Sequence, residues 1–238
     1  MGLDEMQELS EVNNRLMDGL NFCKKTYKIF ESIRASKGGI QKLRLREGRL
    51  EKKLIEELLP VTRYVQMKYS HVRKIKVKWI DGNQAYDAYL LSSGPQVERG
   101  YVLRKQFLEV TTAVNQKDYL SRKHLNEKGH SWGAKGITQN NKTKEIISKP
   151  FVYSSTEAKD DLIGIILERI KGKSLKNYPQ NTVLVIQCMF DTPFFDSEWD
   201  YIIDKVKNAK IANDFKEIIL FDSNFNYFTT LYGQKQTP

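Results

Sequence analysis

The chain has 238 residues and a mass of 27.7 kDa, which is enough to bury one sizeable hydrophobic core. Its 40% hydrophobic and 29% charged residues are typical of a folded globular protein rather than a disordered one. The chain contains no apolar run long enough to span a membrane, its N-terminus is polar, and two cysteines and three histidines argue against a disulfide framework or a zinc site. We therefore expect a cytoplasmic protein without a membrane partner.

The net charge of the chain is +10, from 39 Lys and Arg against 29 Asp and Glu. Basic residues are concentrated in the segments 41–78 and 99–149, whereas the segment 191–222 is acidic. This asymmetry raises the expectation of a polyanionic partner such as nucleic acid, and a solvated basic surface is the equally weighted alternative.

The N-terminal segment has the spacing of an amphipathic helix. Apolar residues recur at steps of three and four from Leu9 to Phe30, which predicts one long helix that ends near Gly38 and Gly39.

A second helix is predicted from about Leu43 or Leu50 to Tyr69, with Pro60 kinking it. The two helices are expected to pair as a hairpin. Such a pair serves internal packing, or it forms the interface of a homodimer or of a complex with a partner protein.

Three strands follow in the predicted order. Residues 74–80 alternate lysine with Ile, Val and Trp, and Asp81-Gly82-Asn83 has the composition of a hairpin turn. Residues 84–91 and 106–112 then form the next two strands, so the sequence predicts a three-stranded antiparallel meander.

The segment 114–155 is predicted to be an insertion. It begins with a helix over 115–128 and continues with a polar, mobile or inserted stretch, 130–150, that has few periodic apolar residues. We expect an N-terminal helical region, 1–48, followed by an α/β domain, 49–238, that contains this insertion.

The remaining elements complete an α/β pattern. Ser154 and Glu157 have the spacing of a capping box at the start of a helix whose apolar face covers the sheet. The apolar run 182–189 is typical of a central strand buried on both faces, and a helix near 197–208 and a strand over 217–221 follow. The order of elements predicts an α/β fold with a mixed sheet sandwiched by helices.

Two of the predicted strands each carry a single acid among residues that are expected to be buried. These acids are Asp87 and Glu109, and strand periodicity places Glu109 on the same face as Phe107 and Thr111. Carboxylates on neighbouring strands can hold a divalent cation through oxygen ligands, and Mg²⁺ or Mn²⁺ is the natural candidate. Such an ion can polarise a phosphodiester and lower the pKa of an attacking water.

Each of these acids also has a structural alternative. Asp87 could cap a turn or pair with Arg104, and Glu109 could form an ion pair with a lysine of a neighbouring strand such as Lys76.

At these residues the sequence resembles the PD-(D/E)xK, or restriction-endonuclease-like, nuclease superfamily, whose core is a helix, a three-stranded meander, a helix and a further strand. The segment Tyr86-Asp87-Ala88 corresponds to the metal-binding Asp of that family, and Glu109-Val110-Thr111 corresponds to its Glu-x-Lys. The resemblance covers about residues 50–220. It implies a restriction-endonuclease-like α/β fold, a Mg²⁺ or Mn²⁺ cofactor, and hydrolysis of DNA with Asp87 and Glu109 as catalytic metal ligands.

The sequence departs from the family pattern at two positions. Tyr86 stands where the name of the motif has Pro, and Thr111 stands where the family places its catalytic lysine. In some members the following helix supplies the lysine, which makes Lys173 the candidate here; the alternative is an exposed lysine at a helix end. The family also places a Glu near the metal from the first core helix, a role for which Glu57 is the candidate unless it faces solvent.

The sequence therefore supports three readings. The first is a divalent-metal-dependent nuclease that acts on DNA, in restriction, phage defence, mobile-element biology or repair. The second is a catalytically inactive nuclease-fold protein that binds nucleic acid or a protein partner, with Thr111 marking the lost lysine. The third is an assembly protein that pairs through its N-terminal helices. Carboxylates of Asp87 and Glu109 that converge near a lysine amine would favour the first reading.

Overall fold

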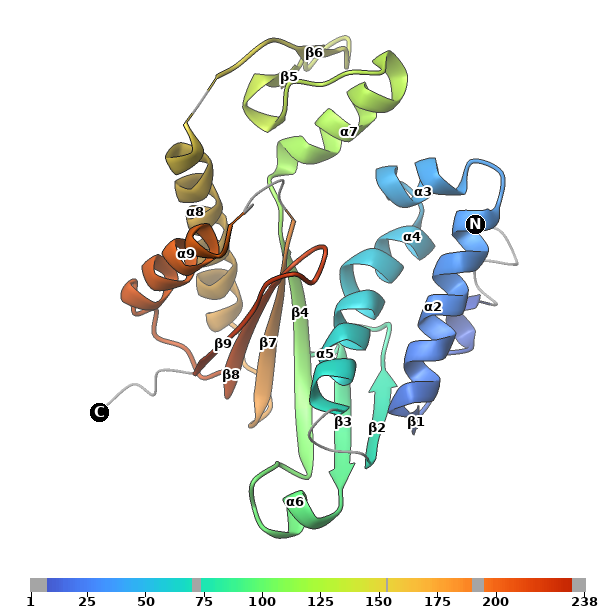
Figure 1. The fold of residues 1–238 in the computed structure, drawn as a ribbon. Helices are drawn as coiled ribbons and strands as arrows, with labels where there is room; N and C mark the ends of the chain where they lie inside the picture. The colour runs from blue at the N-terminus through green and yellow to red at the C-terminus, as the bar shows by residue number, and fades with distance from the viewer. Residues whose placement is uncertain (1–7, 70–73, 153, 190–194, 233–238) are drawn as a thin grey trace.

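The computed structural model describes residues 8–69, 74–152, 154–189 and 195–232. Within these residues the main element is a mixed sheet with strand order β1-β2-β3-β4-β7-β8-β9 (Figure 1). Its strands are β1 (Met17–Asp18), β2 (Lys74–Trp79), β3 (Ala88–Ser93), β4 (Lys105–Ala113), β7 (Thr182–Cys188), β8 (Glu217–Asp222) and β9 (Phe228–Tyr232).

The sheet joins an antiparallel half to a parallel half at β4. On one side β2, β3 and β4 form the predicted antiparallel meander, which is confirmed, and on the other side β4, β7 and β8 run parallel. The strands β1 and β9 add antiparallel edges. Every residue of β7 is buried, as predicted for a central strand.

Helices cover both faces of the sheet, which confirms the predicted α/β sandwich (Figure 1). One layer contains α2 (Gly19–Ala35), α4 (Arg49–Lys53) and α5 (Leu59–Tyr69), and the opposite layer contains α8 (Ser155–Ser174) and α9 (Asp196–Asn208). Successive residues of β4 alternate between these layers, since Leu108 and Val110 join the core beside α5 and Ala113 joins the core beside α8. Glu109 therefore faces the α8 layer.

The single long helix predicted from Leu9 to the glycine pair is wrong. A short strand, β1, interrupts it, and α2 begins only at Gly19. The carboxylate of Asp18 caps α2 by accepting hydrogen bonds from the backbone N–H groups of Leu20 at 2.9 Å and Asn21 at 3.3 Å. The apolar spacing continued through the break because Val12 packs into the same core as the residues of α2.

The predicted second helix is divided. A separate helix, α3 (Gly39–Leu45), ends at Arg46, and a π-helical segment, Leu54–Leu58, joins α4 to α5. Pro60 explains this segment, because it has no N–H to donate within the helix, and the N–H of Leu59 instead reaches the carbonyl of Leu54. The helix therefore contains a widened turn just before Pro60, and this turn contains Glu57.

The segment 114–155 begins as predicted with α7 (Gln116–Lys128), which Asn115 caps and Gly129 ends at φ 77°. The polar stretch after it contains elements that were not predicted: residues 134–136 form a 3₁₀ turn, and β5 (Ile137–Gln139) and β6 (Ile146–Ser148) pair antiparallel. Strands of three residues are too short to show a period in the sequence. In Figure 1 this segment lies beyond the end of the main sheet.

The capping box of Ser154 and Glu157 at the start of α8 is confirmed. A short helix, α6 (Pro95–Glu98), lies between β3 and β4 and was not predicted. In the part of the chain that the structure describes, every helix is too short or too polar to cross a membrane.

The N-terminal cap of α2 can be tested by substitution. We expect Asp18→Ala to lower the free energy of unfolding by about 1 kcal/mol, because two N–H groups lose their acceptor. Asp18→Asn keeps an oxygen acceptor and should change it by less than half as much. Urea denaturation measures both. A continuous helix through this position would give the opposite result, because alanine is the better former of a helix interior.

Candidate active site

Asp87 lies directly before β3 and is fixed to β4. Its N–H donates to the carbonyl of Leu108 at 2.8 Å, and its carboxylate accepts the N–H of Val110 at 2.6 Å. The carboxylate therefore takes the place of a backbone carbonyl at the end of the β3–β4 ladder. Because Ala88 pairs with Leu108, the antiparallel register places Asp87 beside Glu109.

Glu109 is buried in the middle of β4, with 9% of its side chain exposed, and its carboxylate is paired with the ammonium group of Lys173. Lys173 belongs to the last turn of α8 and has 22% of its side chain exposed. One turn earlier on the same helix, Nε of Arg169 donates to the carbonyl of Thr112 at 3.1 Å. These two contacts hold α8 antiparallel along β4.

The structure thus brings together Asp87, Glu109 and Lys173, each of which was predicted from the sequence. Thr111 shares the face of Glu109 and is half-buried. The ammonium group next to Glu109 therefore comes from Lys173 of α8.

Glu57 lies in the π-helical segment and contributes negative charge to the same region. Its Oε1 accepts a hydrogen bond from Nζ of Lys53 at 2.6 Å, and Lys53 also lies 3.3 Å from Asp81. Its Oε2 is buried and has no hydrogen-bond partner among the described residues. Burial is the main cause that raises the pKa of Glu57, against the opposing effect of Lys53.

The sequence did not identify Tyr178, which follows α8. Burial, together with the negative charges of Glu109 and Asp87, raises the pKa of its hydroxyl. The hydroxyl oxygen is buried and forms no hydrogen bond with good geometry in the described part of the chain. No local pattern marks this tyrosine, because only the fold brings the segment after α8 back to β4.

Several negative charges converge at Asp87. Burial, followed by the charges of Glu109 and Glu57, raises the pKa of Asp87 to about 7, and the Val110 N–H and Lys173 only partly oppose this. Asp87 is therefore close to half-protonated at neutral pH. A perturbed carboxylic acid with charged neighbours is typical of a functional site.

The donor set fits a divalent cation. Asp87 and Glu109 offer carboxylate oxygens at adjacent positions, and a cation would relieve the repulsion that raises the pKa of Asp87. The described residues contain no group of three His, Cys, Asp or Glu side chains placed together to hold an ion. The role of Glu57 as a third metal ligand therefore stays a prediction.

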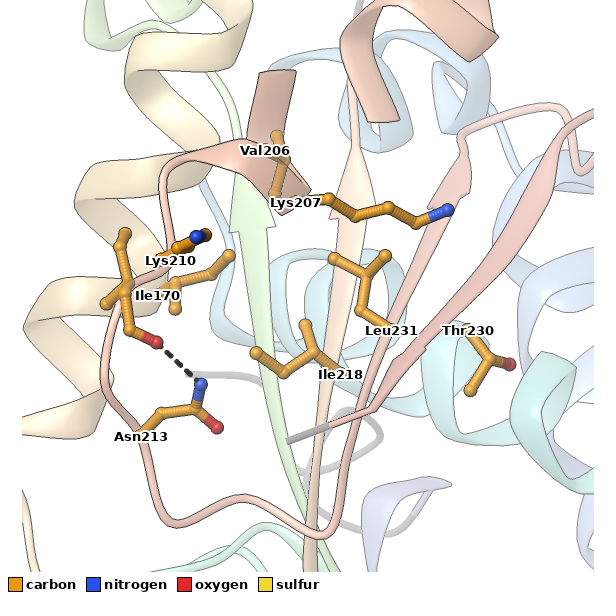
Figure 2. Close-up of a pocket in the computed structure, with 9 residues that line it drawn as sticks. Ile170, Val206, Lys207, Lys210, Asn213, Ile218, Thr230 and Leu231 are labelled. Atoms are coloured by element: carbon orange, nitrogen blue, oxygen red, sulfur yellow. Dashed lines mark hydrogen bonds between the residues drawn. The ribbon is translucent and has the colours of Figure 1, made fainter. Parts of the chain in front are cut away.

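One hollow elsewhere in the described structure lacks this chemistry. A cavity of about 290 Å³ lies between α8, α9 and the strands β8 and β9 (Figure 2). Isoleucine, valine and leucine line much of it, with two lysines and Asn213, whose amide donates to the carbonyl of Ile211 at 2.9 Å. Its lining contains no acid, histidine or cysteine, so the carboxylate cluster is the better candidate for an active site.

Comparison of the chain with models of protein families, with curated proteins and with solved structures found no match.

The raised pKa of Asp87 predicts a pH-dependent stability. The unfolded chain loses this proton near pH 4 and the folded protein near pH 7, so the stabilisation from protonated Asp87 is complete below pH 4 and is lost as the pH rises to 7. We expect Asp87→Asn, which can still accept the Val110 N–H, to be more stable than the wild type at pH 8 by about 2 kcal/mol.

Urea denaturation between pH 4 and pH 8 measures this effect, and the gain should shrink toward pH 4. The exposed Asp204→Asn serves as a control and should show no such gain. If the free energy of unfolding changed with pH in the same way for Asp87→Asn and the wild type, the raised pKa of Asp87 would be contradicted.

Proposed function

We propose that the protein is a divalent-metal-dependent nuclease that hydrolyses DNA phosphodiester bonds and has a restriction-endonuclease-like fold. The observation that carries the proposal is the convergence of Lys173, from α8, on the buried Glu109 beside Asp87. A lysine and two acids are the residue types that the resemblance to the nuclease superfamily implies, and the lysine comes from the following helix.

The order of elements supports the same proposal. A helix formed by α4, the π-helical segment and α5 precedes the meander β2-β3-β4, and α8 and then β7 follow. This order is the core expected from the resemblance, with residues 114–155 inserted between β4 and α8.

Asp87 and Glu109 are the residues that would hold Mg²⁺ or Mn²⁺. When bound, the ion would supply charge stabilisation at the phosphate and lower the pKa of a bound water. The buried Oε2 of Glu57 and the hydroxyl of Tyr178 form no hydrogen bond of good geometry in the described structure, so the carboxylate oxygen can accept a bond from ordered water and the hydroxyl can donate one.

Lys173 can act on Glu109 and on a bound phosphate through its ammonium group. Its Nζ carries a positive charge beside two acids, and 22% exposure of its side chain leaves it reachable from solvent. In this position it can orient the carboxylate of Glu109, stabilise negative charge on a phosphate, and donate or accept a proton at Nζ.

The inserted segment supports nucleic acid as the substrate. Residues 114–155 contain eight Lys and Arg against three Asp and Glu, a net charge of +5 out of +10 for the chain. Trp132 and Phe151 are about half exposed on the same segment, at 53% and 48%. Lysines attract phosphates, and exposed aromatic rings stack on unpaired bases.

A cleavage assay tests the proposal directly. We expect the wild type to cleave DNA with Mg²⁺ and to be inactive with EDTA, and we expect Asp87→Asn and Glu109→Gln to lose activity by about 100-fold or more. Supercoiled, linear and single-stranded DNA, and RNA, should be compared. Equal cleavage by wild type and both variants would identify a contaminant. Salt-sensitive binding without cleavage would support the alternative, an inactive nuclease-fold protein.

The position of the lysine can be tested by moving it. We expect Lys173→Met to reduce cleavage by about 100-fold, because the site loses its only cation that contacts Glu109 among the described residues. Thr111→Lys placed in this variant puts an ammonium on the same face of β4 as Glu109 and should restore part of the activity.

Lys171→Met is the matched control, since Lys171 lies on an exposed position of the same helix and should retain wild-type activity. No recovery in the double variant, with folding intact by circular dichroism, would show that the lysine does more than supply charge at this face.

A further inference from the structure

A polar cavity lies away from Asp87 and Glu109, at the C-terminal ends of the strands β4 and β7. It has a volume of about 440 Å³. Its lining includes Ala113 at the end of β4, Met189 after β7, and side chains of α7 and α8. Arg46 closes it from the end of α3, which packs against α7 (Figure 1).

Two arginines with incomplete hydrogen bonding line this cavity. Arg46 has only 10% of its side chain exposed, and both its Nε and the Nη1 of Arg122 are buried without a hydrogen-bond partner among the described residues. The Nη1 of Arg46 contacts the sulfur of Met189 at 3.0 Å, and a thioether is a weak acceptor. Burial, followed by the charge of Arg122, lowers the pKa of Arg46. The cavity therefore holds two guanidinium groups that need an acceptor.

The acids at the cavity are already engaged. Glu56 lies 3.6 Å from Arg46 and accepts the hydroxyl hydrogen bond of Tyr119 at 2.7 Å. Asp161 forms an ion pair with Lys135 at 2.8 Å. The third acid, Asp118, accepts a hydrogen bond at 3.2 Å from the backbone N–H that follows β4, in the capping box of α7. These contacts leave the Nε of Arg46 and the Nη1 of Arg122 as buried donors without an acceptor among the described residues.

We propose that this cavity binds a phosphate group between Arg46 and Arg122. A phosphate presents several acceptor oxygens and negative charge to planar guanidinium forks, which is the pairing that arginine forms best. The volume is in the range of cavities that hold small ligands, so a phosphate monoester with a group of nucleotide size can enter.

The site is additional to the proposed nuclease centre. Ala113 follows Glu109 by four residues on the same face of β4, a separation of about 13 Å along the strand. The phosphate can therefore come from a free nucleotide or from a nucleic-acid strand that also reaches the carboxylates. Both sources present the same group to the arginines.

Binding of inorganic phosphate to the full chain tests the site. Isothermal titration calorimetry and thermal shift, with chloride at equal ionic strength as reference, should show saturable binding to the wild type. We expect Arg122→Gln to bind phosphate at least tenfold more weakly, since a lost charge-assisted hydrogen bond corresponds to a factor of that size or more. The same variant should keep or gain thermal stability without phosphate, because it removes one of two like charges.

A second variant tests the same site independently, in case Arg122→Gln does not fold. Arg46 has φ 54°, so glycine adopts its backbone conformation without strain, and Arg46→Gly should also bind phosphate at least tenfold more weakly. Arg34→Gln removes an exposed arginine and should bind as the wild type does. Glu109→Gln should also bind normally, which separates this site from the nuclease centre.

Competition then identifies the source of the phosphate. Displacement by adenosine monophosphate indicates a free nucleotide, and displacement only by a single-stranded oligonucleotide indicates a strand. Phosphate that binds the wild type no better than chloride does, or equal phosphate affinity in the wild type and both cavity variants, would overturn the proposal.

Discussion

The buried carboxylate of Glu109 constrains the strands and helices around it, because its negative charge needs a partner inside the protein. Strands pair with β4 on both sides and helices cover both faces, so water cannot solvate this charge, and a buried unpaired carboxylate is destabilising by several kcal/mol. The parallel pairing of β4 with β7 requires a crossover, and α8 provides it. This helix runs antiparallel to β4, with Arg169 at the carbonyl of Thr112 and Lys173 at Glu109, so its last turn brings the lysine to the buried carboxylate.

Lys173 only partly offsets the negative charge of Glu109, and burial and the remaining repulsion together raise the pKa of Asp87. The ladder holds the Asp87 carboxylate beside Glu109 through the N–H of Val110, although the two charges repel and Glu57 adds a third. Glu57 has its own partner in Lys53, so among the described residues Lys173 alone is left to balance both Asp87 and Glu109. The site therefore retains an excess of negative charge in a buried setting, which is unfavourable for stability and favourable for a bound cation. The π-helical turn that Pro60 imposes belongs to the same arrangement, because it contains Glu57.

Much of this arrangement could be predicted from the sequence, because the acids are conspicuous within apolar strands. Asp87 and Glu109 interrupt segments that otherwise alternate or are apolar, and the composition of Asp81-Gly82-Asn83 indicated the antiparallel pairing of the first two strands of the meander. The capping box at Ser154 similarly located the start of α8. Lys173 was identifiable only as one of several lysines near the end of that helix. The rotation of a helix about its axis relative to a sheet depends on packing, and sequence spacing alone does not determine it.

Residues that the fold gathers from distant segments escaped prediction for a different reason. Tyr178 lies in a connection without periodicity. Arg46 and Arg122 are separated by three strands of the main sheet, and in the sequence each resembles an ordinary basic residue of a helical segment. Their significance comes from burial and missing hydrogen-bond partners, which are properties of the folded state. Basic residues in this chain therefore belong to two groups: those exposed to solvent, and arginines that are buried with an N–H donor lacking an acceptor among the described residues. Net charge counts both groups alike and cannot separate a nucleic-acid surface from a phosphate site.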